Sequence, residues 1–397
     1  MSTAPVAEHG HGAQLALAGV VTAVVGFSSS FALVLTGLVA QGATKEQAAS
    51  GLLVLLIAMA VGTAVLTVRF RMPILLAWST PGAALLASTH LPARDWPAAV
   101  GCFLLVAALT ALVGLWPWLA RVMASIPTSI ANAMLAGVLL PICATAFTTL
   151  ARTPLYVGPI LLAWLVGYAF ARRWAVPIAL VVALVVVGLT VGRAPGPADL
   201  VPHLTWTTPA LDWRFVVGLA LPLFVVNLAS QYAPGVAVMK TFGYAVPWRP
   251  TVLVTAGVSV LAAPFGGHAV NLAAISSALS ASPEAHPDPR RRWLAALSAA
   301  GSNLVLAGLS GAAAFVLANS PAGLIITVAA LALLGTLGTA ASQALAEPAD
   351  REAAVITLVT TASGITLLGI GSAFWGLAFG LVVRAVLGFA RGRRSAV

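Results

Sequence analysis

The sequence predicts an all-α polytopic membrane protein, and its composition and the placement of its charges are the observations that predict it. Of the 397 residues, 60% are hydrophobic and 8% are charged, whereas an average soluble domain carries about 25% charged residues. The mean hydropathy is +1.02. Ten acidic and 20 basic side chains cannot cover the surface of a soluble protein of this length. This excludes a soluble enzyme, a nucleic-acid-binding protein and a disordered chain.

The apolar stretches divide into about fourteen transmembrane spans, since a helix needs about 20 apolar residues to cross a bilayer. The third, ninth and tenth spans are short or interrupted. We expect the spans at 13–38, 48–68, 73–90, 97–118, 123–148, 154–171, 174–191, 213–238, 250–264, 265–281, 293–317, 322–343, 353–369 and 371–390.

The basic residues agree with this division. If both termini are cytoplasmic, 15 of the 20 Lys and Arg residues fall on the inner side, as the positive-inside rule requires. The five on the outer side are Lys45, Arg94, Arg152, Arg193 and Arg214. The first dozen residues contain no Lys or Arg, so we expect no cleaved signal peptide and a first span that stays in the membrane.

A polar, proline-rich link at 192–212 divides the spans into two sets of seven. Because seven is odd, the two sets have opposite orientations, which is the plan of an inverted-repeat transporter. The predicted organisation is a cytoplasmic tail (1–12), a first repeat (13–191), a periplasmic linker (192–212), a second repeat (213–390) and a basic C-terminal tail (391–397).

The third span reads as a short extended segment followed by a half-helix. Residues 73–78 suit extended chain, Ser79 and Thr80 can cap a helix, and Pro81 fits the first helical position. Gly82 and the small residues after it continue that helix.

The tenth span is broken in a corresponding place. Pro264, Gly266 and Gly267 interrupt it, and we expect a helix from about His268 that carries Asn271, with residues 265–276 matching 77–88 of the first repeat. Irregular backbone in a membrane is tolerated where it lines a cavity. Two facing half-helix N-termini would bind an anion without a buried Arg, whereas the alternative interpretation is a pair of kinks in ordinary packed helices.

Three segments resemble the benzoate/proton symporter family of bacterial inner membranes. They are RMPILLAWSTPGAALLA (71–87), PFGGHAVNLAAISSALSA (264–281) and HPDPRRRW (286–293), and the resemblance runs from about residue 13 to residue 390. It implies fourteen spans, of which one to four and eight to eleven form a core domain and the others a gate domain. It also implies an aromatic carboxylate as substrate, bound between the half-helices of spans three and ten, and a proton as the coupling ion.

Two amides on the eighth span are candidate substrate ligands. Asn227 and Gln231 are four residues apart and so share a helix face. The nucleobase transporters, which are similar in architecture, carry acidic groups on spans eight and ten, where this chain has Asn227 or Gln231 and Asn271. A neutral amide can bind a carboxylate that an acid would repel. The alternative is interhelical packing.

His268 is the candidate for proton coupling and also for substrate binding. It is the one histidine that we place within a span, since His90 at the end of the third range is counted with the loop. An unperturbed histidine titrates near pH 6.5. The alternative is a neutral His bonded to a backbone carbonyl beside Gly266 and Gly267. Ser79 and Thr80 could likewise bind a carboxylate or only cap the half-helix.

Phe27, Trp78, Tyr232 and Phe265 are candidates for stacking on an aromatic substrate. The complete set of candidate substrate-binding residues is Ser79, Thr80, Gly82, Asn227, Gln231, Gly266, Gly267, His268 and Asn271. We expect no metal and no cofactor.

The sequence therefore favours a secondary active transporter that imports benzoate or a similar aromatic carboxylate with a proton. The alternative is a uniporter, exchanger or channel for another small anion or a nucleobase. An intramembrane enzyme is disfavoured, because the chain has no HExxH or GxSxG motif and no paired acids within its spans. The expected partners are the substrate, a proton, the lipid bilayer of the bacterial inner membrane and a second copy of the chain, with no nucleic acid.

Overall fold

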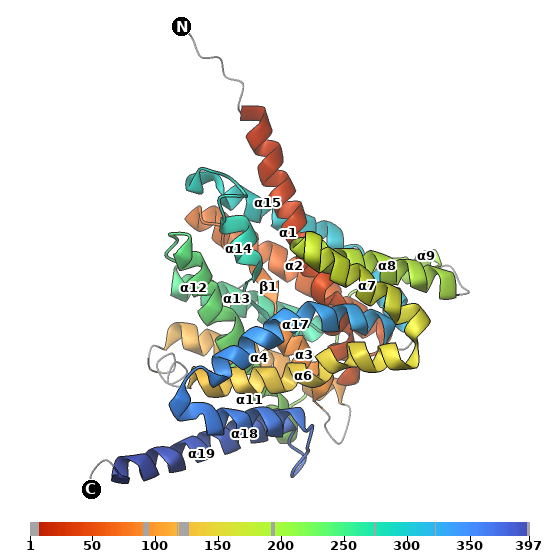
Figure 1. Ribbon diagram of the computed structural model, residues 1–397. Coiled ribbons are helices and arrows are strands. Elements are labelled where there is room, and N and C mark those ends of the chain that lie inside the picture. The colour runs from red at the N-terminus through yellow and green to blue at the C-terminus, as the bar shows by residue number, and fades with distance from the viewer. Residues whose placement is uncertain are drawn as a thin grey trace.

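The computed structural model describes residues 8–89, 95–116, 118, 127–191, 195–273, 275–321 and 323–394, and nearly all of the regular structure is helical (Figure 1). The first half of the chain forms α1 (Glu8–Ala40), α2 (Lys45–Phe70), α3 (Thr80–Ser88), α4 (Trp96–Leu115), α6 (Thr128–Arg152), α7 (Pro154–Phe170), α8 (Ala175–Thr190) and the short α9 (Pro197–Leu200). Arg94 and Arg193, which we predict on the outer side of the membrane, are not among the described residues.

The second half begins with one long helical segment in which α10 (Trp213–Phe215), α11 (Leu221–Asn227) and α12 (Ala233–Thr241) are joined by π-helical turns at Val216–Ala220 and Leu228–Tyr232. It continues with α13 (Trp248–Ala262), α14 (Ile275–Ala281), α15 (Trp293–Ala307), α16 (Ser310–Asn319), α17 (Leu324–Leu345), α18 (Arg351–Ala362) and α19 (Ser372–Arg394).

Each of the fourteen predicted ranges contains helix in its described part. Within the described residues, eight helices are long and apolar enough to cross a membrane, or nine if α15 and α16, bent by 55°, count as one span. The count of fourteen stays a prediction. Helix α1 already begins at Glu8 and α19 continues to Arg394, so both helices extend into the predicted tails, whose limits stay predictions. Residues 1–7 and 395–397 lie outside the described residues.

The helix contacts recur in pairs that are related by exchanging the two halves of the chain. Helix α1 packs on α15, and its counterpart α10–α12 packs on α4. Helix α2 packs on α15 while α13 packs on α4, and α7 packs on α8 while α18 packs on α19. This pairing is the one expected of an inverted repeat.

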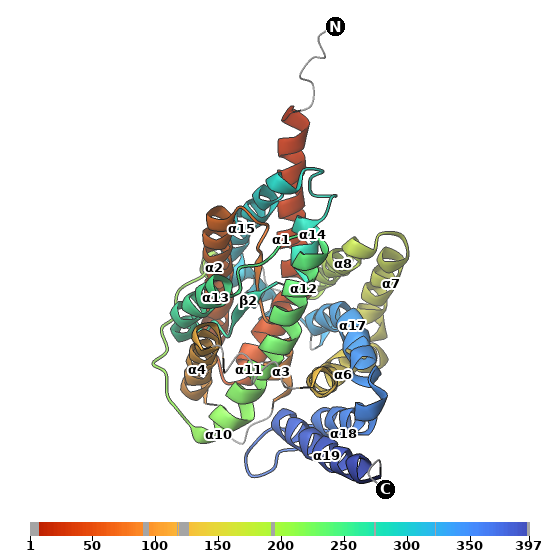
Figure 2. The ribbon, with the colours of Figure 1, turned by 90° about the vertical axis from the view of Figure 1, so that its left-hand side faces the viewer.

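The helices form two groups, as the family resemblance implies. The core domain comprises α1–α4 and α10–α16, and the gate domain comprises α6–α8 and α17–α19. Figure 2 shows the gate helices on the right and below, beside core helices α2, α4 and α13 on the left. Helices α1 and α3 of the core domain contact α17, α8 and α6 of the gate domain.

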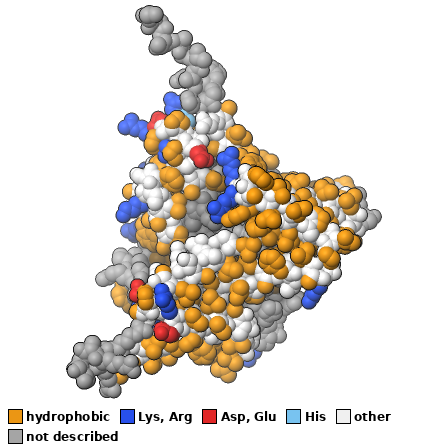
Figure 3. Space-filling view, in the orientation of Figure 1, with side chains coloured by type: hydrophobic (Ala, Val, Ile, Leu, Met, Phe, Trp, Pro, Cys, Tyr) orange, Lys and Arg blue, Asp and Glu red, His pale blue; other side chains and the backbone are white. Residues whose placement is uncertain are grey.

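The face of the molecule in Figure 3 is largely apolar. Leu155, Phe170 and Leu189 of the gate domain are 86%, 88% and 83% exposed. Such a surface is unstable in water but suits contact with lipid. The chain is therefore built to be solvated by a bilayer.

The two broken spans meet in a two-stranded antiparallel sheet. Strand β1 (Leu76–Trp78) pairs with β2 (Val270–Leu272), with Ala77 opposite Asn271. The hydrogen bonds continue beyond the strands, since the Ser79 amide donates to the Ala269 carbonyl at 3.3 Å and the Ala273 amide to the Leu75 carbonyl at 2.9 Å.

The outward-facing amides of the two strands are satisfied in the same way. The Leu76 amide donates to Oγ1 of Thr63 on α2 at 2.9 Å, and the Val270 amide donates to Oγ of Ser259 on α13 at 3.0 Å. Because α2 and α13 are counterparts in the two halves, the same kind of hydrogen bond, from a strand amide to a hydroxyl of the neighbouring helix, occurs in both halves. It removes the cost of unpaired backbone amides in an apolar interior.

Candidate functional site

The first broken span folds as the sequence predicts. Ser79 caps α3, and its Oγ accepts a hydrogen bond from the Gly82 amide at 2.9 Å. Pro81 lies in the first turn, where a helix has no use for its missing amide hydrogen. The capped end of α3 therefore lies directly after β1 in the interior of the protein.

The predicted start of the second half-helix near His268 was wrong. A 3-10 turn at Ala263–Phe265 leads to Gly266, which has a φ of 95° that favours glycine, and the chain then stays extended through β2. Helix α14 begins at Ile275, so His268 and Asn271 precede it. The predicted match between residues 77–88 and 265–276 is displaced for the same reason, because β2 rather than 264–266 corresponds to β1.

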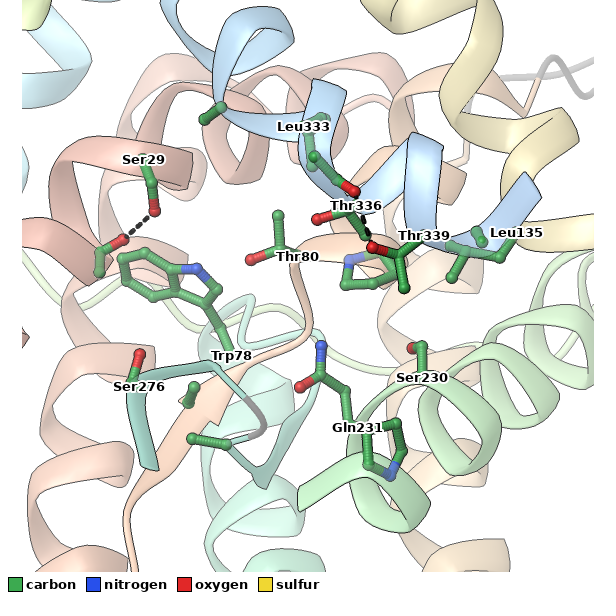
Figure 4. Close-up of a pocket in the computed structure, with 18 of the residues that line it drawn as sticks. Ser29, Trp78, Thr80, Leu135, Ser230, Gln231, Ser276, Leu333, Thr336 and Thr339 are labelled. Atoms are coloured by element: carbon green, nitrogen blue, oxygen red, sulfur yellow. Dashed lines mark hydrogen bonds between the residues drawn. The ribbon is translucent and has the colours of Figure 1, made fainter. Parts of the chain in front are cut away.

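A cavity of about 460 Å³ lies between the core and gate domains and reaches both broken spans. The core domain contributes Trp78 of β1, Thr80 and Pro81 of α3, Ser276 of α14 and Gln231 of the π-helical turn at Leu228–Tyr232. Leu135 of α6 and Leu333, Thr336 and Thr339 of α17 face them from the gate domain (Figure 4).

Trp78 forms an aromatic wall of this cavity, and it is held in one orientation. Its Nε1 donates to Oγ of Ser30 at 2.8 Å, and the Thr80 hydroxyl donates to the same Oγ at 3.2 Å. The Phe27 ring packs against the indole at 6.3 Å between centroids. Phe27 thus supports Trp78 and does not itself line the cavity.

Gln231 reaches the cavity, whereas Asn227 does not. In the close-up, the Gln231 amide points into the space near Trp78 and Thr80 (Figure 4). Asn227 is 1% exposed, and neither polar atom of its side chain has a hydrogen-bond partner among the described residues. A π-helical turn at Leu228–Tyr232 follows Asn227 and contains Gln231.

His268 lies at the cap of α3 and outside the cavity lining. Its Nε2 is 3.1 Å from the Ser79 carbonyl, and since a carbonyl only accepts, this nitrogen carries the hydrogen. Its Nδ1 is buried without a hydrogen-bond partner among the described residues. The Phe103 ring packs edge-on at 6.3 Å.

Several other candidates shape the backbone and do not line the cavity. An added Cβ on Gly82 would come within 2.7 Å of Leu223 Cδ1, and one on Gly267 within 2.6 Å of Ala262 Cβ. Gly266 makes the turn before His268, and Asn271 is buried in β2. These residues hold the two broken spans in place.

Two of the predicted stacking residues also face other neighbours. The Tyr232 hydroxyl lies 2.6 Å from Thr255 Oγ1, and its ring packs edge-on against Trp248. Phe265 packs edge-on against Trp206 at 5.4 Å between centroids. Of the four predicted aromatic residues, only Trp78 lines the cavity within the described chain.

The structure adds cavity residues that the sequence did not single out as ligands. They are Ser29, Asn132, Ser230, Ser276, Thr336, Thr339 and Gln343, together with Arg172 and Arg173. Thr336 and Thr339 are three residues apart on a largely apolar span, which places them on one helix face. Only the docking of that face against the core domain makes it part of a site.

Comparisons with known proteins agree with this architecture. The family model described as benzoate membrane transport protein matches residues 12–386. Inner membrane protein YdcO of Escherichia coli is 43% identical, with 94% of this chain and 95% of that protein covered. A protein named benzoate membrane transport protein from Acinetobacter baylyi is 32% identical, with 83% and 85% covered.

Solved structures of anion transporters share the fold. The transmembrane domain of the cyanobacterial bicarbonate transporter BicA has a TM-score of 0.56 at 14% identity, covering 95% of this chain and 97% of that one. SLC26A9 has a TM-score of 0.62 at 13% identity, covering 94% and 65%. These likenesses confirm the inverted-repeat fold, and the family and sequence matches show that this membrane transporter belongs to the benzoate membrane transport protein family.

Proposed function

We propose that the chain imports benzoate or a similar aromatic carboxylate together with a proton across the bacterial inner membrane. The observation that carries this proposal is the cavity, which combines the indole wall of Trp78 with the Thr80 hydroxyl and the Gln231 amide. An aromatic ring would pack on the indole. The Gln231 amide would donate a hydrogen bond to the carboxylate, and so would the Thr80 hydroxyl after rotating its hydrogen away from Ser30. No Asp or Glu is among the described residues that line the cavity.

The position of the cavity supports alternating access. It lies between the core and gate domains, so a movement of one domain against the other would expose it first to one side and then to the other. We also propose that both termini lie in the cytoplasm, which the distribution of Lys and Arg supports. The proposed repeats span 13–191 and 213–390, and the proposed assembly is a homodimer.

His268 is the proposed proton-coupling residue, acting through the cap of α3. A second proton on the ring would sit at Nδ1, the nitrogen without a partner among the described residues. The charge would arise next to the Ser79 carbonyl, which the ring already contacts. Protonation of His268 would therefore act on the N-terminal end of α3, which lies between His268 and the cavity.

The test is uptake of labelled benzoate into proteoliposomes with an imposed inward proton gradient. Empty liposomes are the control, because protonated benzoic acid crosses lipid unaided. We expect protein-dependent accumulation that collapses with a protonophore. Flux that does not depend on the proton gradient would indicate a uniporter or exchanger instead of a symporter. Flux no greater than in empty liposomes would refute benzoate as the substrate.

His268→Gln tests the coupling step separately. We expect loss of proton-driven accumulation with retained benzoate exchange, since exchange moves substrate in both directions and needs no net proton transfer. Retention of both activities would remove His268 from the coupling mechanism. Thermal unfolding of the purified variant distinguishes lost coupling from lost folding.

A further inference from the structure

Two adjacent arginines give the cavity a positive wall that the proposed substrate site does not use. Arg172 and Arg173 lie in the 3-10 turn between α7 and α8, on the gate domain, and both line the cavity. They are the only charged side chains among the described residues of that lining. The distribution of charge along the chain explains Arg172 and Arg173 only as residues of an inner loop.

The turn places both arginines at the cavity from the gate side. The Trp174 amide donates to the Ala171 carbonyl at 2.7 Å and so closes the turn. The Arg172 guanidinium carbon lies 4.9 Å from the centre of the Tyr168 ring, which is a favourable cation–π distance. This contact orients Arg172 without neutralising its charge.

Among the described residues, Arg173 forms an ion pair with Glu284, which belongs to the core domain. Its Nη1 lies 3.8 Å from Oε2 of Glu284, and the two side chains are 60% and 81% exposed. An exposed ion pair at this distance is weak. A carboxylate that enters the cavity can therefore replace Glu284 at Arg173. Among the residues that the structure describes, no ion pair involves Arg172.

We propose that Arg172 and Arg173 form an anion subsite at the cytoplasmic mouth of the cavity, which binds a small organic monocarboxylate as it passes between the cytoplasm and Trp78, Thr80 and Gln231. The subsite rests on the proposed function, since it assigns a further role to the same cavity. Its long-range attraction raises the local concentration of an anionic substrate. The inner residues, which are all uncharged, then need only recognise the ring and orient the carboxylate.

The test compares benzoate counterflow in proteoliposomes for the wild type and three variants. For Arg172→Gln/Arg173→Gln, we expect KM to rise about 3- to 10-fold, with the maximal rate within about twofold. Arg172→Lys/Arg173→Lys keeps the charge and should restore KM. Arg249→Gln, which removes an exposed charge elsewhere, should match the wild type.

A single-site experiment returns the charge chemically. The native Cys102 and Cys143 are buried, so Arg172→Cys offers an exposed thiol. Modification with a cationic methanethiosulfonate should lower KM relative to the unmodified variant, and modification with an anionic one should raise it. Equal effects of both reagents would overturn the electrostatic role.

The outcomes separate this inference from the function on which it rests. A wild type without benzoate counterflow refutes the proposed function and the subsite together. A wild type with counterflow, combined with an unchanged KM in the double glutamine variant or an equally raised KM in the double lysine variant, refutes the subsite alone. A raised KM in the glutamine variant that lysine restores supports the subsite.

Discussion

At the scale of single residues, Trp78 is held by one set of neighbours while another part of its ring lines the cavity. Ser30 and Phe27 hold the indole, and the free part of the ring faces the cavity. A side chain fixed in this way loses little freedom when a ligand binds. The same ring would be a poor binding surface if its Nε1 were unpaired in an apolar interior.

Trp78→Ala should therefore raise KM for benzoate by up to about 10-fold, because an aromatic pair is worth about 0.5–1.5 kcal/mol beyond its buried area. Trp78→Phe should retain most of the affinity. Trp116→Ala is the matched control, since Trp116 is exposed and does not line the cavity. Counterflow kinetics would measure all three, and an unaffected Trp78→Ala variant would remove the indole from the site.

Asn227 and Gln231 should respond in opposite ways to replacement by Leu. Gln231→Leu should raise KM, because it removes an amide that lines the cavity. Asn227→Leu should leave KM unchanged and raise the melting temperature, since a buried polar group without partners costs about 1–3 kcal/mol. Kinetics and thermal unfolding of the same two preparations test this pair. A raised KM for Asn227→Leu would return Asn227 to the binding site.

At the scale of elements, the two half-helices differ in how far sequence predicts them. Ser79, Pro81 and Gly82 are local cues for a cap and a helix start, and α3 follows them. Residues 269–279 would suit a helix throughout, yet 270–272 are held extended by pairing with β1. That pairing joins residues about two hundred positions apart, so no local pattern reveals it. The gate wall at Thr336 and Thr339 was missed for a similar reason, because it depends on how α17 docks.

The half-helix α3 depends on close packing at Gly82. A methyl group there would come within 2.7 Å of Leu223 Cδ1 and of Ser79 Oγ, the capping atom. Gly82→Ala should destabilise the protein by about 1–3 kcal/mol, as overpacking does. Adding Leu223→Ala relieves the contact with Leu223, so the double variant should unfold at a higher temperature than additive effects predict. Simple additivity would show that the two sites are independent.

The gate domain has a brace of its own at Asp350. Its carboxylate accepts hydrogen bonds from Ser129 Oγ at 2.7 Å and from Arg384 Nε at 2.8 Å, which joins α6 and α19 at the start of α18. Asp350→Asn should lower the apparent melting temperature, because charge-assisted hydrogen bonds are about twice as strong as neutral ones. Glu347→Gln, at an exposed site nearby, is the control. Equal melting temperatures for the two variants would argue against the brace.

At the scale of the whole molecule, the paired strands join the two halves of the core domain by backbone hydrogen bonds, so we expect these halves to move together. We therefore expect the proposed alternating access to come from movement between the core and gate domains, where the cavity lies. The apolar composition and the charge distribution were enough to predict the membrane-protein class and the inverted repeat. They could not predict which side chains surround the cavity, because that depends on packing between helices from both halves.

A disulfide between the strands tests whether the core moves as one body. Leu76 and Leu272 are direct partners in the sheet and both are buried. Leu76→Cys/Leu272→Cys should therefore form a disulfide on oxidation and still transport benzoate, with the reduced protein as its own control. Transport that stops on oxidation and returns on reduction would show that the two broken spans separate during the cycle.

The strand pairing also has a consequence for how the protein is made. Strand β1 emerges from the ribosome long before β2, and several backbone hydrogen bonds of the first broken span wait for the second. Unpaired backbone is costly in lipid, so the early half is expected to stay shielded by the insertion machinery until residues 269–273 arrive. Synthesis of the two halves as separate chains should then give stable protein only when both are made in the same cell.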